Sequence, residues 1–424
     1  MRRAYRFRLY PRSKQEFRLL DTLHACHQLY NIALEDRRTA WKEHQQSVGF
    51  ADQSHFLPLL KQEDEQLSAV TAQVLQDVLH RVDKAFAGFF RRVQAGVRPA
   101  GYPRFKAYHR YHSFTYPQYP SGAVLVRTEK RHDLLRLHKI GDVPIMLHRE
   151  IEGKVKTVTI VRDVNRWYAV FSVDAGPAPK PVPIGPGMKA VGVDVGLESL
   201  LTLSNGAVIG NPRWLRQSEA RLKRFGRRVS RRERRSANRR KARARLAQAH
   251  QKVREQRRDF VEKVSRWLVD EFDVIGFEDL RIRDLVRGNP RSKSINDAGW
   301  RMLRSRTASK GEGAGKWAVS VEPSWTSVDC SACGTPVRKE LWERTHRCPV
   351  CGLVVGRDWN AAVNVLWRTL DRVGPGGPLG HVRSRIGREP AESTPAERTA
   401  ATREPRAPPQ AGSMKQDASP FKGW

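Results

Sequence analysis

The sequence predicts a multidomain protein of the α+β class, and three observations lead to that prediction. Its 424 residues are enough for two or three domains with cores of their own. The spacing of apolar residues changes along the chain between the period of two that is typical of strands and the spacing of helices. A stretch rich in proline and glycine at residues 176–187 predicts a linker between domains.

The first part of the chain is expected to combine helices with short strands. Residues 2–10 alternate like a strand that ends at Pro11. Helical spacing follows from Ser13 to about His44 and again around 67–97, and Cys26 is expected in the core. Further strands, together a candidate for a small β-barrel, are expected at 123–127, 134–137, 143–147, 155–162 and 167–173.

The part after the linker predicts a second set of strands and helices. A long basic helical region at 213–272 is expected as one helix or as a hairpin of two. From Gly374 onward the chain has too few large apolar residues to form a core, which predicts disorder. Two buried strands are expected at 190–196 and 272–280. A hairpin with an Asn-Gly turn is expected at 202–209, and a helix at 358–370.

The charge of the chain points to a polyanionic partner. Its 78 Lys and Arg against 44 Asp and Glu give a formal net charge of +34. An excess of this size is typical of nucleic-acid-binding proteins, and the alternative is a solvated basic surface without a dedicated partner. The sequence has no apolar run of about 18 residues and no apolar segment of a secretory signal, so no membrane partner is expected and a cytoplasmic protein is predicted.

Three acidic residues stand out by their positions. Asp194 lies within an apolar strand, Glu278 ends another strand and Asp358 begins a helix. Taken singly, each has an alternative interpretation as a surface or capping residue. Burying a carboxylate, however, costs on the order of several kcal/mol unless a partner or metal compensates it. Because pairs of Mg²⁺ ions held by carboxylates hydrolyse phosphodiesters, we predict a magnesium site, and the order of the acids resembles that of the RNase H-like fold.

Four of the five cysteines form two C-x-x-C pairs in one short segment. Each pair is followed by a glycine, Gly334 or Gly352, as tight metal-binding turns favour. This spacing fits a tetrahedral zinc site, with an iron–sulfur or redox site as the alternative. Four thiolates would leave no open position for catalysis, so the zinc is expected to stabilise a small nucleic-acid-facing module. The predicted ligands are Cys330, Cys333, Cys348 and Cys351.

Two basic segments are candidates for contacts with nucleic acid. The segment 221–252 is crowded with arginine, which predicts a contact with structured RNA or a heteroduplex, or alternatively a solvated helical arm. In the segment 102–116 basic residues alternate with aromatic ones, which fits either base stacking or the core of the β-barrel. The candidate contact residues are Arg104, Lys106, Arg227, Arg228, Arg231, Arg232, Arg239 and Arg240.

Taken together, these motifs resemble the transposon-encoded TnpB (OrfB) family, whose members are related to the type V CRISPR effectors. The resemblance spans about residues 1–370 and leaves the rest of the chain unexplained. It is carried by an ordered set of motifs at 103–106, 113–116, 191–196, 277–280, 296–300, 326–334, 346–352 and 357–362.

The resemblance implies a particular division of the chain. Residues 1–12 and 99–185 would form a split β-barrel, the wedge domain, with a helical recognition domain at 13–98 inserted. A RuvC-like nuclease domain of the RNase H-like class would comprise 186–324 and 353–372, with the zinc ribbon at 325–352 inserted to bind target nucleic acid. Residues 373–424 lie beyond the resemblance, and their composition predicts a disordered basic tail.

The resemblance also implies an activity. The protein would be an RNA-guided DNA endonuclease of a transposable element, with a guide RNA from the transposon end, and would cut double-stranded DNA beside a short adjacent motif. Asp194, Glu278 and Asp358 would be the catalytic residues that bind Mg²⁺. We expect a monomer on its RNA in a prokaryotic cytoplasm, associated with the nucleoid when bound to DNA. The alternatives are a cleavage-deficient, guide-directed repressor and a transposase or accessory transposition protein.

Overall fold

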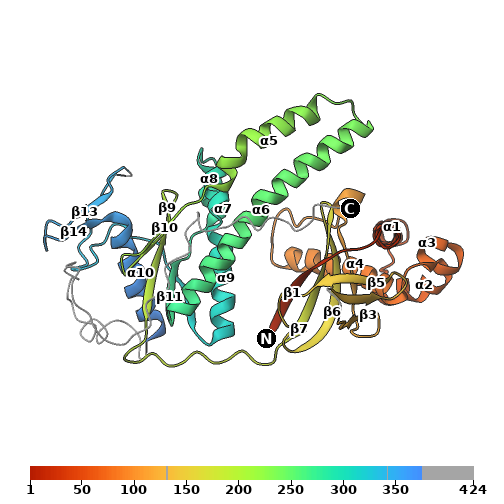
Figure 1. The fold of residues 1–424 in the computed structure, drawn as a ribbon, viewed down its shortest axis with the longest axis horizontal. Coiled ribbons are helices and arrows are strands. Elements are labelled where there is room, and N and C mark those ends of the chain that lie inside the picture. The colour runs from red at the N-terminus through yellow and green to blue at the C-terminus, as the bar shows by residue number, and fades with distance from the viewer. Residues whose placement is uncertain (130–131, 341, 375–424) are drawn as a thin grey trace. The chain divides into compact units, whose positions relative to one another are not determined.

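The computed structural model describes residues 1–374 apart from 130, 131 and 341 (Figure 1). The chain divides into two units, Met1–Pro177 and Ala178–Trp424. The predicted disordered tail lies, from residue 375 on, outside the described residues. Among the residues that are described, no helix is long and apolar enough to cross a membrane.

A seven-stranded antiparallel sheet is the frame of the first unit, with the order β2-β6-β7-β1-β5-β4-β3. Strand β1 (Arg2–Leu9) lies between β7 (Arg166–Asp174) and β5 (Gly141–Met146). The remaining strands are β2 (Ser113–Tyr116), β3 (Ala123–Val126), β4 (Asp133–Leu137) and β6 (Lys154–Asp163). The predicted strands are confirmed, and β2 is an addition to them.

Four helices follow β1 before the chain returns to the sheet. They are α1 (Ser13–His44), α2 (Phe50–Glu63), α3 (Glu65–Ser68) and α4 (Ala72–Gln94). Helices α1 and α4 pack on each other through apolar stripes at helical spacing, and Cys26 is fully buried there as predicted. A short 3₁₀ helix (Tyr108–Arg110) precedes β2.

The structure divides the aromatic residues of the segment 102–116 between the two interpretations left open above. Tyr111, Phe114 and Tyr116 are at most 4% exposed and belong to the core. Tyr102 and Phe105, by contrast, are 44% and 48% exposed. Only the first half of the segment therefore leaves its rings accessible.

A five-stranded mixed sheet is the frame of the second unit, with the order β10-β9-β8-β11-β12. Strands β8 (Ala190–Val195), β11 (Val274–Glu278) and β12 (Trp317–Val321) pair in parallel. Strands β9 (Ser199–Leu203) and β10 (Val208–Gly210) extend the sheet as the predicted hairpin, with Gly206 at positive φ in its turn.

The helices of this unit cover the sheet on both faces. Val191, Val193 and Phe277 share a core with the apolar face of α6 (Ala237–Glu271). Side chains alternate along a strand, so the neighbouring positions face the other way, toward α10 (Arg357–Val373). The remaining helices are α5 (Trp214–Ser230), α7 (Ile282–Val286), α8 (Ser292–Ala298) and α9 (Trp300–Ala314), the last of which packs on α6 and β12.

Helix α10 lies directly against the backbone of the two central strands. A Cβ atom at Gly192 would overlap the carbonyl oxygen of Ala362, and one at Gly276 would overlap the hydroxyl of Thr369. Only glycine at these two strand positions permits so close an approach. The glycines therefore fix the height and direction of α10 on the sheet.

The basic helical region is a hairpin of two helices rather than one helix. Helices α5 and α6 run side by side (Figure 1), packed through Leu222, Ala249 and Val253. The turn between them is held locally: Ser236 accepts a hydrogen bond from the backbone of Arg239, whose guanidinium donates to the carbonyl of Arg232 at 2.8 Å.

Candidate active site and metal centre

Asp194 and Glu278 lie side by side where two parallel strands end. Val193 and Phe277 are register partners in β8 and β11, so the next residues, Asp194 and Glu278, occupy matching positions. Each acid stands two positions after a glycine that contacts α10. Because side chains alternate along a strand, the side chain of the acid points to the same face of the sheet, the one that α10 covers. Carboxyl ends of parallel strands are the usual place for a functional site in such sheets.

Asp358 reaches the same end of the sheet from α10. The helix crosses from β8 to β11, because Ala362 lies over Gly192 and the later Thr369 lies over Gly276, the register partner of Gly192. Asp358 stands one turn before Ala362, at the start of the helix and toward its β8 side. The charge of Asp358 raises the pKa of Asp194, so the two carboxyl groups lie near each other.

Burial and the two other carboxylates act on the pKa of Asp194. Burial raises the pKa of Asp194 well above its ordinary value, and the charges of Glu278 and Asp358 raise it further. The pKa of Glu278 is also raised, chiefly by burial, although its hydrogen bond with Thr326 and the charge of Arg368 oppose the rise. Carboxylates in this condition favour any cation that replaces their lost hydration.

The carboxylates nevertheless do not close into a tight set. Within the described ranges, only the cysteine cluster brings three or more candidate ligand atoms within 4.8 Å of one another. The side chain of Arg344 supplies a positive charge near these acids, since its guanidinium lies 3.7 Å from Asp358 and 3.1 Å from Glu198. Reasoning from the sequence missed Arg344 and Glu198, because only folding brings them next to the first turn of α10.

A row of polar side chains along α10 fixes the loop that leads into the cysteine cluster. Asn364 donates to the carbonyls of Thr326 and Asp329 at 2.8 and 2.7 Å. Asn360, one turn earlier, donates to the carbonyl of Asp329 at 2.8 Å and accepts from the amide of Ser331 at 2.9 Å. The hydroxyl of Thr326 donates to Glu278, so the same loop also holds one of the carboxylates.

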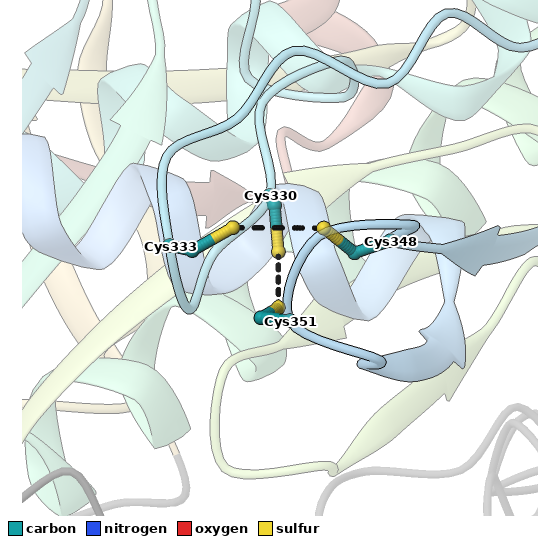
Figure 2. Close-up of side chains that lie close together, drawn as sticks. All are labelled: Cys330, Cys333, Cys348 and Cys351. Atoms are coloured by element: carbon teal, nitrogen blue, oxygen red, sulfur yellow. Dashed lines mark hydrogen bonds between the residues drawn. The ribbon is translucent and has the colours of Figure 1, made fainter.

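The four predicted cysteines form a compact cluster (Figure 2), in which their side chains point toward one another. The sulfur atoms of Cys330 and Cys351 are 3.6 Å apart, and those of Cys333 and Cys348 are 3.5 Å apart. Disulfide bonds would need about 2.05 Å, whereas sulfurs around a tetrahedral ion at about 2.3 Å lie about 3.8 Å apart. The cluster therefore fits a bound metal ion.

The two halves of the cluster have the same backbone structure. The amides of Gly334 and Gly352 donate to the carbonyls of Cys330 and Cys348 at 2.8 and 3.0 Å. Both glycines are in the left-handed region, with φ of 78° and 73°. The amides of Cys330 and Cys348 in turn donate to residues five positions ahead, each at 2.9 Å. The second half lies between β13 (Thr345–Arg347) and β14 (Val354–Gly356).

The candidate nucleic-acid contacts do not all lie in comparable environments. Arg104, Arg227, Arg228, Arg231, Arg232 and Arg240 are exposed. Lys106 instead places its ammonium 3.9 Å from the ring centre of Tyr30, and its pKa is lowered by burial and then by Arg81. Arg239 closes the hairpin turn. These last two residues are therefore occupied with structural contacts.

Sequence comparisons cover most of the chain. Residues 1–46, 174–288 and 300–365 match family models described as "Helix-turn-helix domain", "Probable transposase" and "Cas12f1-like, TNB domain". In this structure residues 1–46 form a strand and one long helix instead of a helix-turn-helix.

Two similar proteins match over nearly the whole chain. A protein of Streptomyces pristinaespiralis named as a candidate RNA-guided DNA endonuclease is 34% identical over 94% of this chain and 98% of its own length. A protein of Escherichia coli K12, InsQ, carries the same designation. It is 28% identical over 86% of this chain and 91% of its own length.

Solved structures show the same fold despite low identity. The structure of a Cas12f1–sgRNA–target DNA complex matches 83% of this chain and 82% of its own with a TM-score of 0.55 and 14% identity. The structure of the mini-RNA-guided endonuclease CRISPR-Cas_phi3 matches 89% of this chain and 94% of its own. Its TM-score is also 0.55, at 10% identity.

The sequence motifs, the match to the transposase model and the full-length similarity to the Streptomyces protein agree with one another. The resemblance predicted from the sequence is thus confirmed, and the chain belongs to the TnpB (OrfB) family of transposon-encoded proteins.

Proposed function

We propose that this protein is an RNA-guided DNA endonuclease of a transposable element. The observation that carries the proposal is the convergence of Asp194, Glu278 and Asp358 from β8, β11 and α10, in a chain whose full-length relatives are named as such endonucleases. A guide RNA from the transposon end would pair with one strand of double-stranded target DNA. The complex would be a monomer and would cut beside a short adjacent motif.

The three carboxylates suit Mg²⁺ better than a closed metal cage. Mg²⁺ keeps several of its waters, so a loose set of acids leaves the room it needs. The raised pKa values of Asp194 and Glu278 mean that their charged forms lack stabilisation in the free protein. Asp194, Glu278 and Asp358 would hold a pair of Mg²⁺ ions, whose chemistry would be to activate water and to stabilise the leaving oxygen of a phosphodiester. The contribution of the protein itself would be to hold the three carboxylates in place on two strands and a helix.

We further propose that the cysteine cluster holds a structural zinc ion. Four thiolates at tetrahedral spacing suit zinc and complete its coordination, so this site takes no part in the chemistry. The module would have a structural role, because the loop that leads into it is hydrogen-bonded to α10 and to Glu278. Zinc would thereby stabilise the path of the nucleic acid next to the carboxylates.

The domain assignment made from the sequence remains our proposal for the whole chain. The wedge would comprise 1–12 and 99–185 and the recognition domain 13–98. The RuvC-like nuclease domain would comprise 186–324 and 353–372, with the zinc-ribbon insert at 325–352. The two glycine contacts of α10 and the parallel strands β8, β11 and β12 support the nuclease assignment.

The decisive experiment is cleavage of a matched plasmid by the protein purified with its own RNA. We expect cutting that needs Mg²⁺ and a target matching the guide, and no cutting by Asp194→Ala. Asp259→Ala is a matched control, since Asp259 is an exposed acid paired with Lys263 on α6. If Asp194→Ala cuts like the parent, the assignment of the carboxylates is wrong.

The same experiment separates the other functions. Occupancy of the target without cleavage at every Mg²⁺ concentration would instead indicate a guide-directed DNA-binding repressor. Joining of DNA ends in a donor–target assay would indicate a transposase.

We propose that the α5–α6 hairpin binds the guide RNA. Arg227, Arg228, Arg231 and Arg232 are exposed near its tip, and no ion pair with a carboxylate is found for them among the described residues. Changing all four to Gln should weaken RNA binding and lower the slope of log K against log salt by about 0.7 for each lost phosphate contact. Arg266→Gln removes an arginine that is paired with Asp270 and should leave the slope unchanged.

A further inference from the structure

Trp325 combines two properties that a tryptophan rarely has together. Its φ of 68° lies in the left-handed region, which a bulky side chain seldom adopts. Its indole is 56% exposed, although tryptophan is normally buried against other apolar groups. No ring-stacking or cation–π contact is found for it in the part of the chain that is described. An unusual backbone conformation of this kind is most often kept at functional sites.

The surrounding contacts hold Trp325 in this conformation. The next residue, Thr326, is 2% exposed, bonds Glu278 through its hydroxyl and accepts from Asn364 through its carbonyl. On the other side, Arg368 donates to the carbonyls of Ser324 and Glu322. The carbonyl of Trp325 itself accepts from the amides of residues 328 and 329 at 3.0 and 2.9 Å. The loop is thus rigid, whereas the indole it carries remains free.

The position of the Trp325 backbone relative to Glu278 follows from these contacts. Thr326 touches Glu278 directly, and the Cα of Trp325 is about 3.8 Å from that of Thr326 along the chain. Bases along a strand are spaced by about 3.4 Å. The backbone of Trp325 therefore stands one residue from the contact with Glu278, a separation comparable to one or two nucleotides of a bound strand.

From this geometry we infer that Trp325 stacks on an unpaired nucleobase of the DNA strand at the carboxylate site and so positions the scissile phosphate. The inference rests on the proposed endonuclease activity. Aromatic rings that stand free beside the path of a strand bind bases of any sequence, because every base has a π face. Trp325 would be a positioning residue, and the carboxylates would remain the groups that contact the reacting atoms through metal.

The test is a scan of abasic sites in the target of the guided complex. A single abasic position next to the cut should slow the parent protein by about 5- to 150-fold, the range expected for loss of one stacked base. Trp325→Ala should slow cleavage of the intact target by a similar factor and should no longer respond to that abasic site. Trp325→Phe should keep most of the response, since it keeps a ring.

Two further variants separate the ring from the fold. Trp325→Gly suits the left-handed backbone and should behave like Trp325→Ala while its thermal unfolding stays at or above that of the parent. Trp342→Ala removes another indole of the same module, 75% exposed, and should match the parent. If Trp325→Ala and the parent give the same abasic profile, the inference is overturned.

A binding measurement makes the test independent of cleavage. In a guided Asp194→Asn complex, 2-aminopurine at the sensitive position should lose fluorescence on binding, and the added Trp325→Ala change should restore it. Equal quenching with and without the indole contradicts the inference. A parent protein that binds its target but never cuts it contradicts the proposed activity instead, while the fluorescence still decides whether Trp325 contacts a base.

Discussion

The cysteine cluster and the carboxylate site are two metal-site candidates in one unit, and they are built in opposite ways. The cysteines come from two short turns with the same backbone hydrogen bonds, and their sulfurs already stand at the spacing of a tetrahedral site. The carboxylates come from two strands and a helix that are far apart in the sequence, and they remain further apart in space. The first site is complete by itself, whereas the second depends on the packing of the whole sheet.

This difference teaches how the two sites divide their tasks. A closed set of thiolates holds its metal for structure and leaves no coordination position for substrate. A loose set of carboxylates with raised pKa values leaves space for water and for a phosphate. The row of Asn360, Asn364 and Arg368 on α10 connects them, because it binds the loop that touches Glu278 and leads to Cys330. Changes at either site should therefore have different consequences.

The largest effect is expected from Cys330→Ser. Loss of one thiolate should abolish stoichiometric zinc binding, since structural zinc sites contribute apparent free energies on the order of 10–16 kcal/mol that depend on all ligands. Metal analysis should fall from about one zinc per chain to a small fraction, and residues 322–356 should become sensitive to protease. Cys26→Ala removes a buried thiol outside the cluster and should keep the zinc. Retained zinc in Cys330→Ser would contradict the four-cysteine site.

Asp194→Asn should have opposite effects on cleavage and on stability. Cleavage should fall by about a thousandfold or more, because the metal contributes several kcal/mol through this ligand. The metal-free variant should nevertheless unfold at a higher temperature than the parent at neutral pH, and its free energy of unfolding should be larger by on the order of 1–3 kcal/mol. The reason is that it lacks a buried charge that also lies near two like charges.

The pH dependence provides the control for this prediction. The pKa of Asp194 is higher in the folded protein than in the unfolded chain, so the parent loses stability as pH rises from the ordinary carboxyl range through the raised value. Asparagine does not titrate, and the advantage of Asp194→Asn should disappear in acid. An advantage that persists in acid would mean that neither the burial of the Asp194 charge nor its repulsion by the other carboxylates is the cause.

Asn364→Asp tests the connection between the sites. The change keeps the shape of the side chain but replaces the amide that donates to the carbonyls of Thr326 and Asp329. We expect a loss of about 1–3 kcal/mol in the free energy of unfolding, from buried acceptors left without a donor. Zinc content should be unchanged while cleavage falls. Loss of zinc together with cleavage would show instead that the cysteine cluster depends on α10.

The smallest effect is expected from Thr326→Val, which removes only the hydroxyl that bonds Glu278. That hydrogen bond holds the pKa of Glu278 down against burial, so its loss should raise the pKa further. Glu278 must be ionised to bind metal, and the acid limb of the pH–rate profile should therefore move to higher pH, with activity about tenfold lower on that limb. Thr326→Ser keeps the hydroxyl and should leave the limb in place.

Much of the secondary structure could be predicted from the pattern of apolar residues. The strands and long helices with clear periods agree with the structure, down to the hairpin at Gly206. Strand β12 and helix α2 were missed, because β12 shows no alternation of buried and exposed residues, and α2 contains Pro58 and buries the polar Gln53 in its covered stripe. The rings of 102–116 could not be assigned either, since burial of Tyr111 and exposure of Tyr102 depend on which helices cover them.

The cysteine site could be read from the amino-acid sequence alone, because two C-x-x-C-G turns fold locally and carry their ligands at fixed spacing. The charge and the identity of the three acids as candidates could be read there too. The matching positions of Asp194 and Glu278, and the crossing of α10 over their strands at Gly192 and Gly276, depend instead on tertiary packing. The physical reason is that strand register and helix contact are properties of distant segments packed together, and no local spacing encodes them. The same packing placed Arg344 beside Asp358 and left Trp325 exposed next to Thr326, the residue that bonds Glu278.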